Sequence, residues 1–238
     1  MATSGSIDFT LNRNEIILDA CEEIGIAIDG EALDSSVIGV ANRVLNRMIK
    51  AWVAYGLNLW KRDSYSLTLV ASTNTYTFGP TGTAASSTRP LRILECDRKH
   101  TDGTTTSMTF MELMEYESLS NKDSTGTPVN FYYSPDIPNG TFKIWPTPDA
   151  TAATDYTVEI IYHAPFEDFD TASDEPDFPQ EWLEALVYGL AWRLAGKYGD
   201  LDAYEKRDLK QRADESLSLA LSWDVEDGSV YFHPDMSH

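Results

Sequence analysis

The sequence predicts an α+β protein, in which helices from both ends of the chain form one bundle and an antiparallel β-sheet domain is inserted between them. Apolar residues recur at helical spacing between residues 10 and 56 and again between 179 and 222. Between Tyr65 and His163 they alternate with polar residues, which is the period of a half-buried strand. An extended tail follows the last helix. We therefore expect four parts, at residues 1–60, 61–165, 166–222 and 223–238.

The first part predicts a pair of helices. Thr10 is placed to cap the first helix, whose apolar stripe stops near Gly25. A polar link at 29–31 precedes the second helix, which Asp34 can cap and which stops near Gly56. A single apolar stripe must pack on something else, so we expect this helical hairpin to lie against further helices.

The middle part predicts an antiparallel sheet domain with one short helix. A glycine-rich loop without phosphate-binding spacing occupies 79–88, and Asp102-Gly103 is a strong hairpin signal. Thr109 and Glu112 have the spacing of a capping box, which predicts a short helix to about Leu119. The strands are expected at 65–69, 74–78, 90–96, 104–109, 129–133, 141–145 and 156–163.

The third part opens with an acidic linker at 164–178, which has no periodicity and contains prolines. Pro179 suits the first turn of a helix, and Gly199 suits a left-handed stop. This helix is apolar over most of its circumference, so it should be buried from more than one direction, in its own core or partly against another subunit. The expected bundle core is Trp52, Trp182, Leu186, Leu190 and Leu194. A last helix at 201–222 would bury Leu209, Ala213, Leu217 and Leu221.

The tail after residue 222 carries too little apolar surface to fold alone. Its large apolar side chains include Trp223, Val225, Tyr231 and Phe232. Aromatic side chains carry most of the binding energy in many interfaces, so these four residues are the expected docking anchors of the tail. The alternative is that the tail lies on its own subunit.

The charge balance is acidic, with 38 Asp and Glu against 18 Lys and Arg and a net charge of −20. Such a surface repels phosphate backbones, which disfavours specific DNA binding and leaves DNA free to slide past. No apolar run approaches the roughly 18 residues of a membrane span, and the N-terminus lacks the pattern of a secretory signal, so we expect synthesis in the cytoplasm. Cys21 and Cys96 predict two reduced, buried thiols.

Enzyme signals are weak throughout the chain. The histidines show no metal-ligand spacing, and no nucleophile elbow, Walker or dinucleotide motif is present. The acidic run at 167–175 invites a calcium interpretation but lacks the glycine that an EF-hand loop needs for its turn. The sequence therefore predicts no enzyme activity, no catalytic residue, no metal and no cofactor.

The order of several segments resembles the head-to-tail adaptor proteins of short-tailed phages, also called head-completion or packaged-DNA-stabilisation proteins. No single segment is a catalytic signature, and the specificity lies in their succession. The segments are 41–60, Arg-Pro-Leu-Arg-Ile at 89–93, Gly-Thr-Pro at 126–128, Tyr-Tyr-Ser-Pro at 132–135, Lys-Ile-Trp-Pro-Thr-Pro-Asp at 143–149, and 177–195.

The resemblance implies a structural virion protein that forms a ring, dodecameric in relatives, under the portal. It implies that the ring extends the DNA channel, retains packaged DNA and meets tail nozzle, fibre or spike proteins. The tail at 223–238 would then be the portal-binding element. Two other classes remain open, a virion-associated cell-wall hydrolase and a carbohydrate-binding tail module.

Overall fold

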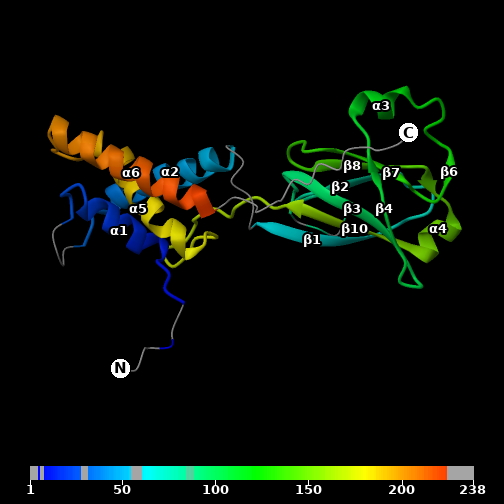
Figure 1. The fold of residues 1–238 in the computed structure, drawn as a ribbon, viewed down its shortest axis with the longest axis horizontal. Helices are drawn as coiled ribbons and strands as arrows, with labels where there is room; N and C mark the ends of the chain where they lie inside the picture. The colour runs from blue at the N-terminus through cyan, green and yellow to red at the C-terminus, as the bar shows by residue number, and fades with distance from the viewer. Residues whose placement is uncertain are drawn as a thin grey trace, which may run out of the picture. The chain divides into compact units, whose positions relative to one another are not determined.

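The computed structural model describes residues 5, 8–27, 32–54, 61–84, 86 and 88–223. The protein is α+β, as predicted. Its described residues divide into two compact units. The helical unit combines the residues up to 54 with those from Phe166 onward, and the sheet unit holds the residues from 61 to Pro165. Figure 1 shows blue α1 and cyan α2 from the start of the chain beside yellow α5 and orange α6 from its end.

The helical unit is organised around α5. Its elements are α1 (Arg13–Glu22), α2 (Ser35–Ala54), a 3₁₀ turn (Gln180–Trp182), α5 (Leu183–Ala195) and α6 (Ala203–Trp223). Helix α5 contacts α1, α2 and α6. Eight of its 13 residues are buried, which agrees with the burial from several directions that its apolar circumference predicts.

A glycine lets α2 and α5 approach closely. A Cβ atom at Gly189 would lie 3.0 Å from the sulfur of Met48 and 3.3 Å from Cζ2 of Trp52. Both of these α2 side chains are buried. Interiors are packed as densely as organic crystals, so there is no spare volume for a larger residue at 189.

The helix starts were predicted with mixed success. Asp34 caps α2, since its Oδ1 accepts the N–H of Ser36 at 2.7 Å. The prediction for Thr10 is wrong, because Asn12 caps α1 and closes a reciprocal capping box with Glu15. Helix α1 ends at Glu22, and Gly25 adopts a positive φ of 70° just beyond it. The expected link at 29–31 and stop at Gly56 lie outside the described residues.

The predicted stop at Gly199 is wrong. Helix α5 ends four residues earlier, at Ala195, with Gly196 in a right-handed conformation at φ −71°. The carbonyl of Leu194 accepts the N–H groups of both Lys197 and Tyr198, at 2.8 and 3.0 Å. A tightened last turn therefore satisfies the end of the helix without a left-handed residue.

The buried stripe of α6 also differs from the prediction. Leu209 and Ala213 are buried as expected, but Leu217 is half-buried and Leu221 is 37% exposed. Residues spaced strictly by four drift about 40° per step around a helix of 3.6 residues per turn. The stripe that stays on the core alternates steps of four and three and consists of Leu209, Ala213, Ser216 and Ala220.

The sheet unit contains two four-stranded sheets. The first is antiparallel, in the order β1 (Arg62–Thr68), β10 (Tyr156–His163), β3 (Arg92–His100) and β4 (Thr105–Ser107). The second has the order β2 (Thr75–Phe78), β8 (Gly140–Trp145), β7 (Asn130–Ser134) and β5 (Thr109–Phe110), and only its β5–β7 pair is parallel. A small parallel pair joins β6 (Thr125–Gly126) to β9 (Thr147–Pro148).

Side chains of both four-stranded sheets make one core. Phe78 and Phe142 are nearly or fully buried and meet edge to face, with ring centroids 5.7 Å apart. Val158 and Ile160, at alternate positions of β10, are buried in the same cluster. The hairpin prediction is confirmed, because Gly103 has φ 92° and Asp102 Oδ1 accepts the N–H of Thr104 at 2.7 Å.

Of the two short helices of the sheet unit, one was predicted with the wrong start and the other was not predicted. Thr109 does not cap a helix, because its N–H bonds to the carbonyl of Val129 and it belongs to β5. The following helix, α3 (Leu113–Ser118), begins after Glu112. Helix α4 (Ala150–Asp155) was not predicted, and Asp149 caps it through the N–H of Ala152 at 2.7 Å. None of the described helices has the length and apolarity needed to cross a membrane.

Replacing Leu190 by Asp should prevent the helical unit from folding. Leu190 is fully buried on α5, and burying an unpaired carboxylate costs several kcal/mol, a large share of the roughly 5–15 kcal/mol that stabilises a domain. The measurement is soluble yield and thermal unfolding. Leu219→Asp is the control, since Leu219 is 61% exposed on α6. Equal melting temperatures for Leu190→Asp and wild type would contradict the burial argument.

Replacing Gly189 by Leu should destabilise the protein by about 1–3 kcal/mol or more, because the added atoms would overlap Met48 and Trp52. Gly196→Leu is the matched control, since a Cβ atom there meets nothing within 4 Å. Chemical denaturation of the two variants measures the difference. A Gly189→Leu variant as stable as Gly196→Leu would show that the α2–α5 contact adapts freely.

Candidate functional site

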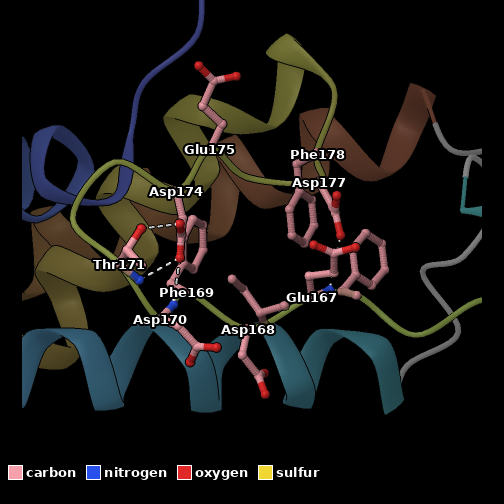
Figure 2. A pocket seen from close by; sticks show the side chains of 11 residues that line it. Glu167, Asp168, Phe169, Asp170, Thr171, Asp174, Glu175, Asp177 and Phe178 are labelled. Carbon is pink, nitrogen blue, oxygen red and sulfur yellow. Dashed lines mark hydrogen bonds between the residues drawn. The ribbon is translucent and has the colours of Figure 1, made fainter. Parts of the chain in front are cut away.

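An acidic hollow of the helical unit lies at the segment before α5, residues 166–178, which we call the acidic segment. This pocket has a volume of about 380 Å³. Carboxylates and phenylalanines of the acidic segment line it together with Ile49 of α2. Figure 2 shows the segment passing over α2, with the carboxylates of Asp168 and Asp170 toward α2 and that of Glu175 on the opposite side.

Two α2 side chains hold the acidic segment by its backbone. Asn46 Oδ1 accepts the N–H of Phe169 at 3.0 Å, and Asn46 Nδ2 donates to the Phe169 carbonyl at 3.3 Å. The Lys50 ammonium donates to the carbonyl of Phe166 at 2.8 Å and lies 2.8 Å from the Asp168 carboxylate. Because Asn46 pairs with both polar groups of one residue, it fixes the register of the segment on α2.

The first turn of α1 binds the other side of the acidic segment. The N–H of Arg13 donates to the Asp174 carbonyl at 2.8 Å, and the N–H of Asn14 donates to the Ala172 carbonyl at 3.3 Å. The Arg13 guanidinium reaches the carbonyl of Asp170 at 3.2 Å. These N–H groups lie at the start of α1, where a helix provides no internal acceptors, so the segment satisfies them.

Aromatic rings attach the two ends of the acidic segment to the helices. Phe166 and Phe178 stack, with centroids 4.6 Å apart and planes 12° from parallel. Phe178 also contacts Trp52 at 6.2 Å and Trp182 at 5.6 Å, and the two tryptophans lie 5.8 Å apart. The cluster therefore joins α2, the acidic segment and the start of α5 through ring contacts.

Asp174 organises the turn within the acidic segment. Its carboxylate accepts the N–H groups of Asp170 and Thr171, at 2.7 and 2.6 Å, and the Thr171 hydroxyl. Hydrogen bonds from the Thr171 side chain and then from the backbone lower the pKa of Asp174. Asp177 acts similarly, accepting the N–H of Glu167 at 3.0 Å. These carboxylates serve as backbone acceptors.

The acidic segment has no arrangement for metal or acid–base chemistry. Within the described part of the chain, no three His, Cys, Asp or Glu side chains converge as metal ligands. In Figure 2 the carboxylates of Asp168 and Asp170 point away from that of Glu175. A general acid of a glycosidase needs a raised pKa, whereas the pKa of Asp174 is lowered.

The described histidines and the two cysteines are packed against neighbouring residues of the fold. His163 ends β10, and burial followed by the nearby charges of Arg62 and Arg92 lowers its pKa. His100 packs edge to face on Tyr156 at 4.8 Å. Cys21 and Cys96 are buried and unpaired, and burial raises the pKa of both thiols, so neither has the character of a reactive thiolate.

The residues expected in the bundle core are all buried in the helical unit. Trp52 is 3% exposed and Trp182 is 1% exposed, while Leu186, Leu190 and Leu194 are fully buried. Trp223 is the last residue of α6. The other expected tail anchors, Val225, Tyr231 and Phe232, lie outside the described residues.

Sequence reasoning did not predict that the acidic segment packs against the helices. The segment was expected to be a linker, yet Phe166 and Phe169 are 3% and 4% exposed. The available signal was three phenylalanines within 13 residues, an apolar content that a solvated linker does not need. Asn46 and Lys50 gave no signal of their own, because polar residues on an amphipathic helix normally face solvent.

Replacing Asp174 by Asn should lower the melting temperature at neutral pH. Because the folded-state pKa of Asp174 is depressed, its ionised form stabilises the fold above the ordinary value of 3.8, and this contribution is lost as the pH falls through the lowered value. Thermal unfolding of both proteins from pH 7 to pH 3 should show a gap that narrows with acid. Asp170→Asn removes the same charge from an exposed carboxylate and should leave the melting temperature unchanged. A gap independent of pH would contradict the role given to the Asp174 charge.

The chain was compared with known proteins. A family model described as SU10 adaptor protein matches residues 14–231, which is most of the chain. No curated protein matches it significantly. The matched range includes both the helical and the sheet unit. The chain therefore belongs to the SU10 adaptor protein family, a family of phage head-to-tail adaptors.

Proposed function

We propose that this protein is a head-to-tail adaptor that forms a ring under the portal of a phage particle. The single observation that carries the proposal is the family match over residues 14–231. The ring would extend the DNA channel from the portal toward the tail and help to retain packaged DNA. The copy number that its relatives suggest is twelve.

Charge supports the proposed place in the channel. The chain carries a net charge of −20, and a ring repeats that charge in every subunit. Double-stranded DNA is repelled by such a surface, so it can pass through the lumen without binding to a specific sequence. Retention of DNA would then depend on closing the channel and not on gripping the phosphates.

The partners that follow from this role are the portal protein on one side and tail nozzle, fibre or spike proteins on the other. The protein would be made in the host cytoplasm and end in the neck of the virion. In this arrangement residues 1–60 and 166–222 build a helical bundle, and the sheet domain at 61–165 is inserted into it. The core of the bundle consists of Trp52, Trp182, Leu186, Leu190 and Leu194. The residues at 223–238 form the portal-binding tail.

A cell-wall hydrolase is the first alternative, and the acidic segment argues against it. Asp174 and Asp177 are occupied with the segment's own N–H groups, and the pKa of Asp174 is lowered. A carbohydrate-binding module would need several exposed aromatic rings together on the sheet. Of the described aromatic side chains in the sheet unit, Phe110 is the large exposed one, at 52%. These observations leave the structural role as the best-supported one.

The docking role of the tail rests on its composition. Its large apolar side chains include Trp223, Val225, Tyr231 and Phe232, and acidic residues lie among them at 224, 226, 227 and 235. A segment that orders only when it docks can wrap a partner surface. In this proposal Tyr231 and Phe232 provide most of the binding energy, while the acidic residues set the register against basic portal residues.

Truncation after Ser222 should leave the protein folded and prevent it from joining portal rings. Sedimentation with purified portal rings from the same phage measures binding, and thermal unfolding verifies the fold. Replacing Tyr231 and Phe232 by Ala should weaken binding roughly 30-fold or more, which corresponds to a loss of about 2 kcal/mol.

The matched control replaces Met236 and His238 by Ala, which shortens two tail side chains without touching the aromatic pair. Undiminished portal binding of the truncated chain would refute the assignment of the tail while leaving the adaptor role open. Cleavage of peptidoglycan at enzyme-like rates, lost on replacement of a single carboxylate, would instead favour the hydrolase alternative.

A further inference from the structure

Two grooves of opposite charge lie on the helical unit. The first, which we call the basic groove, has a volume of about 560 Å³ and runs between α2 and the end of α5. Arg47, Arg193 and Lys197 line it above an apolar floor that includes Val44 and Met48. None of the described residues that line this groove is a carboxylate, although the chain has 38 Asp and Glu residues.

The positive charge of the basic groove is available for a partner. Helix α2 contains no acidic residue and three basic ones, Arg43, Arg47 and Lys50. Of these, Lys50 is paired with Asp168, while Arg47 has no ion pair with any described residue. Arg47 and Lys197 are exposed, and Arg193 donates to the carbonyl of Gly189 at 2.9 Å.

The second, which we call the acidic groove, has a volume of about 470 Å³ and lies between α1 and the start of α5. Leu183, Val187 and other apolar groups line it. Its carboxylates are Asp19, Glu22, Glu23 and Glu184, and none of the described residues that line it is a Lys or Arg. Burial and then the charges of Glu22, Glu15 and Glu23 raise the pKa of Asp19, so like charges crowd together there. Arg212 of α6 contacts Tyr188 at the edge of this groove and is paired with Asp208 at 2.9 Å.

The two grooves face in opposite directions across one helix. The acidic groove uses positions 183, 184, 187 and 188, and the basic groove uses 193, 196 and 197. At about 100° of rotation per residue, Arg193 lies roughly 210° around α5 from the centre of the acidic set, and Gly196 and Lys197 follow directly after the helix ends. A contact that joins two different faces of identical subunits is heterologous, and repetition of such a contact closes into a ring when the rotation allows.

We propose that the surface around the basic groove of one copy packs against the surface around the acidic groove of the next copy. This contact joins the subunits of the ring. The inference rests on the ring of the proposed function and names the surfaces that build it. Each groove offers an apolar floor with charged groups around it, and the charges are complementary. Like-charge contacts between two basic or two acidic grooves disfavour the symmetric alternatives, which gives the ring its direction.

Charge reversal on one groove should therefore break assembly, and reversal on both should restore it. Variant one carries Arg47→Glu and Lys197→Glu, and variant two carries Glu22→Arg and Glu184→Arg. All four positions are exposed, so both variants should melt like wild type. We expect each alone to self-associate on portal rings at least about a hundredfold more weakly, since like charges then meet across the contact. An equimolar mixture should assemble like wild type, because the reversed basic groove of variant one then meets the reversed acidic groove of variant two.

The matched control carries Lys206→Glu and Arg207→Glu, which reverses two exposed charges on α6 outside both grooves and should assemble normally. A second readout is carbodiimide coupling in rings made from equal amounts of ¹⁴N- and ¹⁵N-labelled chains. It should join Lys197 of one isotope to Glu22, Glu23 or Glu184 of the other.

Three results would overturn the inference. The first is normal assembly of either variant alone. The second is a mixture of the two folded variants that does not assemble. The third is a ring in which Lys197 couples only to carboxylates other than Glu22, Glu23 and Glu184. In all three cases wild-type rings form, so the proposed function stands. If the wild-type chain binds portal without any contact between copies, the ring itself fails and this interface fails with it.

Discussion

The helical unit depends on the burial of α5. The buried residues of α5 face most of its circumference, so this helix needs neighbours on several sides and cannot lie on the surface of a core. Helices α1, α2 and α6 surround it, and they come from both ends of the chain. This requirement makes the two ends one unit and leaves the residues between them to form another.

The acidic segment shows how a chain of net charge −20 uses some of its carboxylates as acceptors for backbone N–H groups. Asp174 and Asp177 accept backbone N–H groups, and Asn12 and Asp34 do the same at helix starts. An ionised acceptor needs no counter-ion when several N–H dipoles point at it. These carboxylates therefore stabilise local backbone structure while they remain ionised.

The sequence was most informative where a pattern was long. The α+β class, the burial of α5, the Asp34 cap and the extent of β10 follow from periodicity and from one polar residue in the right place. Helix ends were less predictable, because Thr10 and Asn12 are both good caps, and tertiary contacts of Arg13 and Asn14 favour the second. The role of Asn46 and the two charged grooves arise from residues far apart in the sequence, so no local pattern indicates them.

The first and last residues of the sheet unit meet. The N–H of Ala164 donates to the carbonyl of Lys61 at 2.9 Å, directly beyond the paired strands β1 and β10. A segment whose ends lie side by side can be removed from its host or replaced by a different one, since the gap that remains is short enough for a tight turn. Recombination between phages could exchange this module for a sheet with different surface specificity, while the helices before and after it keep their packing.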